Sequence, residues 1–166
     1  LSFAEDAAEV FLAASEDFDL SDEQELSISA YVKVDGPGEV IFQAEQSFGY
    51  YIGTHDDGEL SLTMYFNGFE DLCLSNTQID DGEWHHVAGT YSGSQMKIYV
   101  DGVLENTCDA GTLVSQDEST AITIGTYRQG SSNYQFNGLI NKLSIWNDEL
   151  SLSDLQEDIA SFSLVN

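Results

Sequence analysis

The stretch from residue 80 to residue 109 constrains the fold more than any other part of the sequence. It holds three short runs in which apolar and polar residues alternate, at Trp84–Tyr91, Met96–Val100 and Val103–Cys108. An Asp-Gly pair precedes the first and third runs, and a Ser-Gly-Ser sequence separates the first two. Gly adopts positive φ freely and Asp tolerates it, so these pairs favour tight hairpin turns. The stretch therefore predicts three consecutive antiparallel strands.

Further alternating runs lie on both sides of this meander. They predict strands at residues 26–32, 40–44, 49–53, 60–66 and 121–125. Near the end, Ser153 and Gln156 have the spacing of a capping box and predict the start of a short helix. Many short strands punctuated by turn residues, within 166 residues, are typical of a single all-β sandwich.

Two long motifs resemble a known family. DGEWHHVAGTY at 81–91, followed by KIYVDG at 97–102, resembles the core signature of laminin-G-like and pentraxin-like domains, and FNGLINKLSIWNDELSLSDLQ at 136–156 resembles their closing signature. The resemblance implies a concanavalin A-like jelly roll, in which two antiparallel sheets form a sandwich, with a short C-terminal helix. We expect residues 1–166 to form one such domain. Because the sequence begins at Leu1 without Met, we also expect it to be part of a longer protein.

The chain is strongly acidic. It has 30 Asp and Glu residues against four Lys and Arg, and a formal net charge of −26. Such a surface repels nucleic acid and anionic membranes, which bind through Lys and Arg. No apolar run reaches the roughly 18 residues of a membrane-spanning helix, so membrane insertion is not expected either. The expected partners are a glycan or a cell-surface protein. The simpler interpretation is that the charge only keeps the surface solvated.

The two cysteines bear on the compartment. Cys73 lies just before the meander and Cys108 ends its last run, so neighbouring strands could bring them together. A disulfide would indicate an oxidising, extracellular location, either secreted or at the cell surface. The alternative is two buried free thiols that pack as small apolar side chains.

The sequence lacks recognisable catalytic motifs. The related glycosidases carry paired carboxylates in a Glu-x-Asp-x-Glu or Glu-x-Asp-x-x-Glu motif, which is absent here. A Gly-x-Ser-x-Gly elbow, a Cys/His nucleophile pair and a phosphate-binding loop are absent as well. We therefore predict a protein without enzymatic activity.

The sequence offers few metal ligands with the spacing that a metal site needs. Asp-Asp-Gly-Glu occurs at 56–59 and at 80–83, but it lacks the Asp-x-Asp-x-Asp spacing of a calcium loop and is read as a hairpin turn in both places. His85 and His86 are neighbours on one strand and point to opposite faces, so they cannot chelate the same ion. The resemblance implies a structural Ca²⁺ between the N-terminal and closing strands, for which Asp6 and Asn141 are the candidate ligands.

Residues 126–135 form the candidate ligand-binding loop, because aromatic rings stack on sugar faces while polar side chains bind the hydroxyls. The candidates are Tyr127, Arg128, Asn133 and Tyr134, with Tyr50, His55 and Asp56 as a second wall. They predict a lectin-like module for carbohydrate binding or cell adhesion. Ordinary packing at strand edges would also explain the tyrosines. The alternative function is a protein-contact or structural spacer module in a large acidic surface protein.

Overall fold

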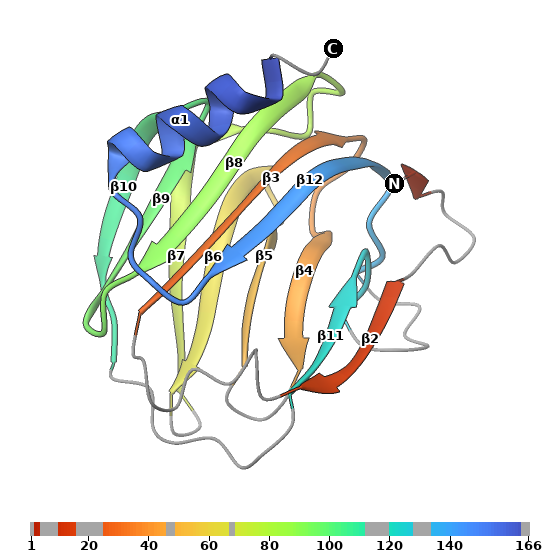
Figure 1. The fold of residues 1–166 in the computed structure, drawn as a ribbon. Coiled ribbons are helices and arrows are strands. Elements are labelled where there is room, and N and C mark those ends of the chain that lie inside the picture. The colour runs from red at the N-terminus through yellow and green to blue at the C-terminus, as the bar shows by residue number, and fades with distance from the viewer. Residues whose placement is uncertain are drawn as a thin grey trace.

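The computed structural model describes residues 2–3, 10–15, 25–45, 49–66, 69–111, 120–127 and 134–163. These residues form a sandwich of two six-stranded antiparallel sheets and one helix (Figure 1). Sheet A has the order β1 (Ser2–Phe3), β12 (Gly138–Trp146), β3 (Leu26–Val34), β8 (Trp84–Tyr91), β9 (Gln95–Val100), β10 (Val103–Asp109). Sheet B has the order β2 (Val10–Ser15), β11 (Thr120–Ile124), β4 (Val40–Glu45), β5 (Tyr50–Thr54), β6 (Glu59–Phe66), β7 (Phe69–Gln78).

The core lies between the two sheets and follows from strand alternation. On β3, Leu26, Ile28, Ala30 and Val32 point inward and are at most 1% exposed. Phe42, Ile52 and Leu62 face them from sheet B and belong to the same buried cluster. The predicted meander is confirmed, because β8 pairs with β9 and β9 pairs with β10, all antiparallel. The predicted jelly-roll sandwich with a C-terminal helix is therefore the fold of the protein.

The two Asp-Asp-Gly-Glu turns have different roles. Residues 56–59 form the turn of the predicted hairpin between β5 and β6. Residues 80–83 instead carry the chain from β7 in sheet B to β8 in sheet A, so the hairpin expected there is wrong. Turn residues set the local bend, but packing decides which sheet the next strand joins. The two turns meet in space, since a Cβ on Gly58 would lie 2.2 Å from Asp80 Oδ1.

Helix α1 (Leu152–Ser163) begins two residues earlier than the predicted cap implies. Its capping box is formed by Ser151 and Asp154, not by Ser153 and Gln156. The Ser151 amide donates to Asp154 Oδ2 at 2.9 Å, and the Asp154 amide donates to Ser151 Oγ at 3.3 Å. Two overlapping patterns of the same spacing occur here. The one with a carboxylate in the first turn also suits the helix dipole.

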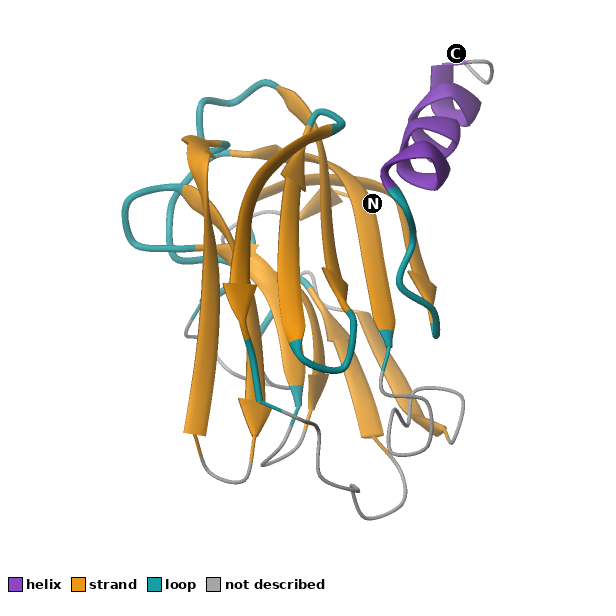
Figure 2. Ribbon diagram, turned by 90° about the vertical axis from the view of Figure 1, so that its left-hand side faces the viewer, coloured by secondary structure: helices purple, strands orange, loops and turns teal. Residues whose placement is uncertain are grey.

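The helix lies outside the sandwich against sheet A, as Figure 2 shows in purple. Asp158 fixes it there: its carboxylate receives hydrogen bonds from Lys142 Nζ at 2.6 Å, from Ser29 Oγ at 2.8 Å and from His86 Nε2 at 3.4 Å. Tyr31 adds a hydrogen bond from its hydroxyl to the Ile159 carbonyl at 3.1 Å and packs edge-on against the His86 ring. The helix is therefore held to the outer face of sheet A by these polar contacts and by the packing of Leu155 against Ala88 and Tyr99.

We expect Asp158→Ala to lower the free energy of unfolding by about 2 kcal/mol, because it leaves Lys142 and His86 without their shared carboxylate. The loss is below that for a fully buried pair, since the Lys142 side chain is 29% exposed. Urea denaturation measures it. Glu157→Ala, at an exposed position on the same helix, is the matched control. Equal midpoints for the two variants would contradict the anchoring role of Asp158.

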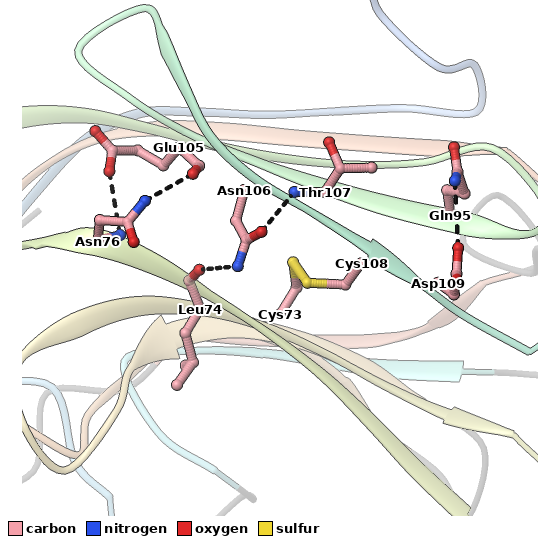
Figure 3. Close-up of a disulfide and its surroundings, with 9 residues drawn as sticks. All are labelled: Cys73, Leu74, Asn76, Gln95, Glu105, Asn106, Thr107, Cys108 and Asp109. Atoms are coloured by element: carbon pink, nitrogen blue, oxygen red, sulfur yellow. Dashed lines mark hydrogen bonds between the residues drawn. A yellow bond between two sulfur atoms is a disulfide. The ribbon is translucent and has the colours of Figure 1, made fainter.

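A disulfide joins the two sheets at one open edge of the sandwich (Figure 3). β7 and β10 are the outermost strands of their sheets, and Cys73 on β7 is bonded to Cys108 on β10. Next to it, Asn106 Nδ2 donates to the Leu74 carbonyl at 3.0 Å and Asn76 Nδ2 donates to the Glu105 carbonyl at 2.8 Å. The predicted disulfide is confirmed, and it links the edge strands of the two sheets.

Candidate functional site

A groove with a volume of about 270 Å³ lies on the outer face of sheet B. Strand alternation places its aromatic residues. On β5, Tyr50 and Ile52 point into the core and are 3% and 0% exposed, so Tyr51 points outward. The side chains that line the groove include those of Tyr51, His55, Asp56, Tyr65, Glu70, Leu72, Tyr127 and Tyr134.

Four tyrosine rings form a continuous aromatic surface in this groove. Tyr51 lies 6.3 Å from Tyr65 in a tilted arrangement and 6.4 Å from Tyr127 in an edge-on one, measured between ring centroids. Tyr127 is 5.7 Å from Tyr134, also edge-on. These separations are those of favourable aromatic pairs. Tyr134 is 57% exposed and presents the most accessible ring.

Hydrogen bonds from backbone amides hold the groove walls in place. The Val40 amide donates to the Tyr134 carbonyl at 3.1 Å, which ties the Tyr134 segment to β4. The Asn137 amide donates to the Glu39 carboxylate at 2.9 Å, and the Glu39 amide donates to Thr54 Oγ1 at 3.0 Å. Gly53 is required here, because a Cβ on it would lie 2.3 Å from the Glu39 carbonyl oxygen. The tyrosines therefore stand on a connected framework.

The groove is acidic at its rim. Burial raises the pKa of Tyr51 and of Tyr65, and the nearby Glu70 carboxylate raises both pKa values further. Both phenols therefore stay neutral near physiological pH and can donate or accept hydrogen bonds. His55, Asp56 and Glu70 add further polar atoms. No Lys or Arg lines the groove among the residues that the structure describes.

The structure brings together four of the seven predicted ligand-binding residues. Tyr127, Tyr134, His55 and Asp56 all line the groove, although they come from two separate segments. Tyr50 does not: it is buried in the core, and Tyr51 takes the place expected for it in the second wall. The remaining two predicted residues, Arg128 and Asn133, lie outside the described residues.

The sequence reasoning did not identify Tyr51, Tyr65, Glu70 and Leu72 as groove residues. Alternation with the apolar Ile52 could have assigned Tyr51 to the outer face. The other three follow from strand pairing, which sets Thr63 opposite Tyr51 and Glu70 opposite Tyr65. Local sequence carries no direct signal for that register.

Calcium stays a prediction. Asn141 is exposed on β12, and its proposed partner Asp6 lies outside the described residues. Within the ranges given above, no group of three or more His, Cys, Asp or Glu side chains is arranged to hold a metal ion. His85 binds Asp101 at 2.9 Å and Asp81 at 3.2 Å, whereas His86 lies beneath the helix, so the two imidazoles have separate partners.

Solved structures share this fold at low sequence identity. A heptameric SAP-like pentraxin from Limulus polyphemus matches with a TM-score of 0.71 and 18% identity, over 93% of this chain and 78% of the pentraxin. Domains LG4-5 of the mouse laminin alpha1 chain match with a TM-score of 0.70 and 13% identity, over 91% of this chain and 43% of theirs. The Ruminococcus gnavus IT-sialidase CBM40 bound to α2,3 sialyllactose matches with a TM-score of 0.68 and 17% identity, over 92% and 96%.

No curated protein matches this chain. Within the described part of the chain, no helix has both the length and the apolar character needed to cross a membrane. A laminin G family model, described as Concanavalin A-like lectin/glucanases superfamily, matches residues 8–156. With this match over most of its length, and with the sandwich fold to go with it, the chain belongs to the concanavalin A-like lectin/glucanase superfamily.

Proposed function

We propose that this protein is a non-catalytic, extracellular recognition module that binds a carbohydrate in the tyrosine groove of sheet B. The observation that carries the proposal is the set of four tyrosine rings beside His55, Asp56 and Glu70. Aromatic faces cover the apolar faces of sugar rings, and carboxylate and imidazole groups bind hydroxyls. A concave aromatic surface with a few polar groups is the usual form of a small-ligand site.

Two observations support this proposal. The structure of the Ruminococcus gnavus CBM40 with α2,3 sialyllactose shows that a protein of the same fold binds a saccharide. The disulfide between Cys73 and Cys108 supports an oxidising location, in which cell-surface glycans are accessible.

We expect Tyr134→Ala to weaken glycan binding by about tenfold, because it removes the most exposed ring of the groove. A glycan array identifies a ligand, and calorimetry with that ligand measures the change for the single variant and for Tyr127→Ala/Tyr134→Ala. Trp84→Ala is the control, since Trp84 is 46% exposed but lies on sheet A. Full glycan binding by a folded double variant would remove this groove from consideration.

Thermal unfolding tests the predicted calcium site. A ligand that binds only the folded protein raises its melting temperature. Thermal unfolding with Ca²⁺ or with chelator, at matched ionic strength, therefore separates a specific calcium site from screening of the acidic surface. A rise with Ca²⁺ that NaCl does not reproduce would indicate a specific calcium site. An equal rise with NaCl would count against the predicted site at Asp6 and Asn141.

A protein-contact role is the second candidate, and one observation favours it. Val103 and Leu104, on the edge strand β10, are 58% and 46% exposed. Exposed apolar side chains on an edge strand suit contact with another protein. A negative glycan array, together with a partner whose binding is lost in Leu104→Lys, would favour this role.

A further inference from the structure

The groove is acidic as well as aromatic, and this combination bears on the kind of saccharide it takes. Asp56 and Glu70 are exposed and line the groove with the tyrosines. Glu70 lies near enough to Tyr51 and Tyr65 for its charge to act on both phenols. A fixed negative charge beside the ring surface repels an anionic ligand and attracts a cationic one.

Basic side chains are placed elsewhere in the described part of the molecule. Lys97 Nζ contacts Glu149 at 2.7 Å, and Lys142 Nζ contacts Asp158 at 2.6 Å. Lys33 is on β3 and shares the outer face of sheet A with Tyr31 by strand alternation. The fourth basic residue of the sequence, Arg128, lies outside the described residues. Within the described residues, no Lys or Arg offsets Asp56 and Glu70 at the groove.

The tyrosine rings add a second attraction for positive charge. The face of an aromatic ring carries a negative partial charge, and a cation held over it within about 6 Å of the centroid is stabilised. Tyr51, Tyr65, Tyr127 and Tyr134 surround the groove with such rings. A ligand with a protonated amine on a sugar ring could use the rings and the carboxylates at the same time.

We propose that the groove selects a saccharide bearing a protonated amine, of the glucosamine type, over its neutral and anionic counterparts. The proposal rests on the proposed function, because it assigns a ligand class to the same site. The ring of the amino sugar packs on the tyrosines, and its ammonium group pairs with Glu70, which lies opposite Tyr65 on the neighbouring strand. The strongly negative field of the whole chain, with its net charge of −26, favours the approach of such a ligand.

The test compares four trisaccharides by calorimetry, at about pH 6 and about 0.1 M salt. They are the β-1,4 trimers of glucosamine, of N-acetylglucosamine and of glucose, and α2,3 sialyllactose as the anionic probe. We expect the glucosamine trimer to bind at least about fivefold more tightly than the two neutral trimers. We expect sialyllactose to bind more weakly than any of them.

Two variants with the same change in charge separate a specific contact from bulk attraction. Glu70→Gln should reduce affinity for the glucosamine trimer about fivefold and leave the glucose trimer unchanged. Glu157→Gln, on the far side of the molecule on helix α1, should change neither. An equal loss in both variants would mean that only the overall charge attracts the amine, and would overturn the proposal.

The remaining outcomes distinguish this inference from the proposed function. Neutral trimers that bind as tightly as the glucosamine trimer, and that lose affinity in Tyr134→Ala, would overturn the amine preference and leave the carbohydrate site in place. Tight binding of sialyllactose would overturn it in the same way. Binding of any trimer that Tyr134→Ala does not weaken, or the absence of all binding, would overturn the amine preference and remove the support for the groove as a saccharide site.

Discussion

Replacing both cysteines is expected to lower the free energy of unfolding by about 4 kcal/mol. The disulfide closes a loop with a sequence separation of 35 residues. In the chain-entropy model, opening a loop of that length returns about 4 kcal/mol of conformational freedom to the unfolded chain. That cost is a large share of the roughly 5–15 kcal/mol by which a domain is normally stable.

The disulfide also affects the local stability of the two strands that it joins. Cys73 and Cys108 connect the outermost strands of the two sheets, so they close the sandwich where strand pairing ends (Figure 3). Without the bond, this pair of edges keeps side-chain hydrogen bonds such as those of Asn76 and Asn106. In the variant without the disulfide, we therefore expect the amide protons of β7 and β10 to exchange faster than those of the central strands β3 and β8.

Urea denaturation of Cys73→Ala/Cys108→Ala measures the global effect, and hydrogen exchange measures the local one. Asn106→Ala is the control for the neighbouring contact: it keeps the disulfide and removes the two hydrogen bonds of the Asn106 side chain, to the Leu74 carbonyl and from the Thr107 amide, so its loss should be about 1–2 kcal/mol. A double-cysteine variant as stable as Asn106→Ala would show that the bond contributes little to stability.

The fold could be predicted from the sequence because its signals are local and repeated. Alternation and Asp-Gly turns indicated the meander, and the closing motif indicated the last strand and the helix. The places where prediction was wrong are those where a local pattern allows two outcomes. Ser151 and Ser153 both begin a pattern that can cap a helix, and the turn at 80–83 can lead into either sheet.

The groove was harder to predict, because it depends on register between strands. Tyr127 and Tyr134 were found as members of a polar aromatic loop, but their neighbours come from β5, β6 and β7. The adjacent Tyr50 and Tyr51 are a different case. They must point to opposite faces, and alternation with the apolar Ile52 is enough to place Tyr50 in the core and Tyr51 in the groove.

Glu39 should make the protein less stable as the pH rises through neutrality. Burial raises the pKa of its carboxyl group to about 7, although the hydrogen bond from the Asn137 amide lowers it, and the nearby carboxylates of Asp35 and Asp80 raise it further. The folded state therefore holds this proton more tightly than the unfolded state, in which the pKa is 4.5. The contribution of the Glu39 carboxyl group to the free energy of unfolding is fully present below pH 4.5 and is lost as the pH rises through about 7.

The size of the effect follows from the difference between the two pKa values. Each pKa unit corresponds to about 1.4 kcal/mol, so ionising Glu39 in the folded protein costs about 3 kcal/mol of stability above neutral pH. Glu39→Gln removes the charge and keeps an oxygen that can accept from Asn137. We expect this variant to exceed the wild-type stability by up to about 3 kcal/mol at about pH 8, and to equal it at about pH 4.

Denaturant unfolding of both proteins across this pH range gives the test, because titration of His85, His86 and Asp158 is common to the two and cancels in the difference. Glu83→Gln, at an exposed position, is the control and should show a flat difference. A flat difference for Glu39→Gln as well would mean that its carboxyl group ionises as freely in the folded protein as in the unfolded chain. Glu39 accepts a hydrogen bond from the Asn137 amide, which lies three residues from Tyr134. A difference that changes with pH would therefore mean that a carboxyl group in the hydrogen-bonded framework of the tyrosine groove ionises near neutral pH.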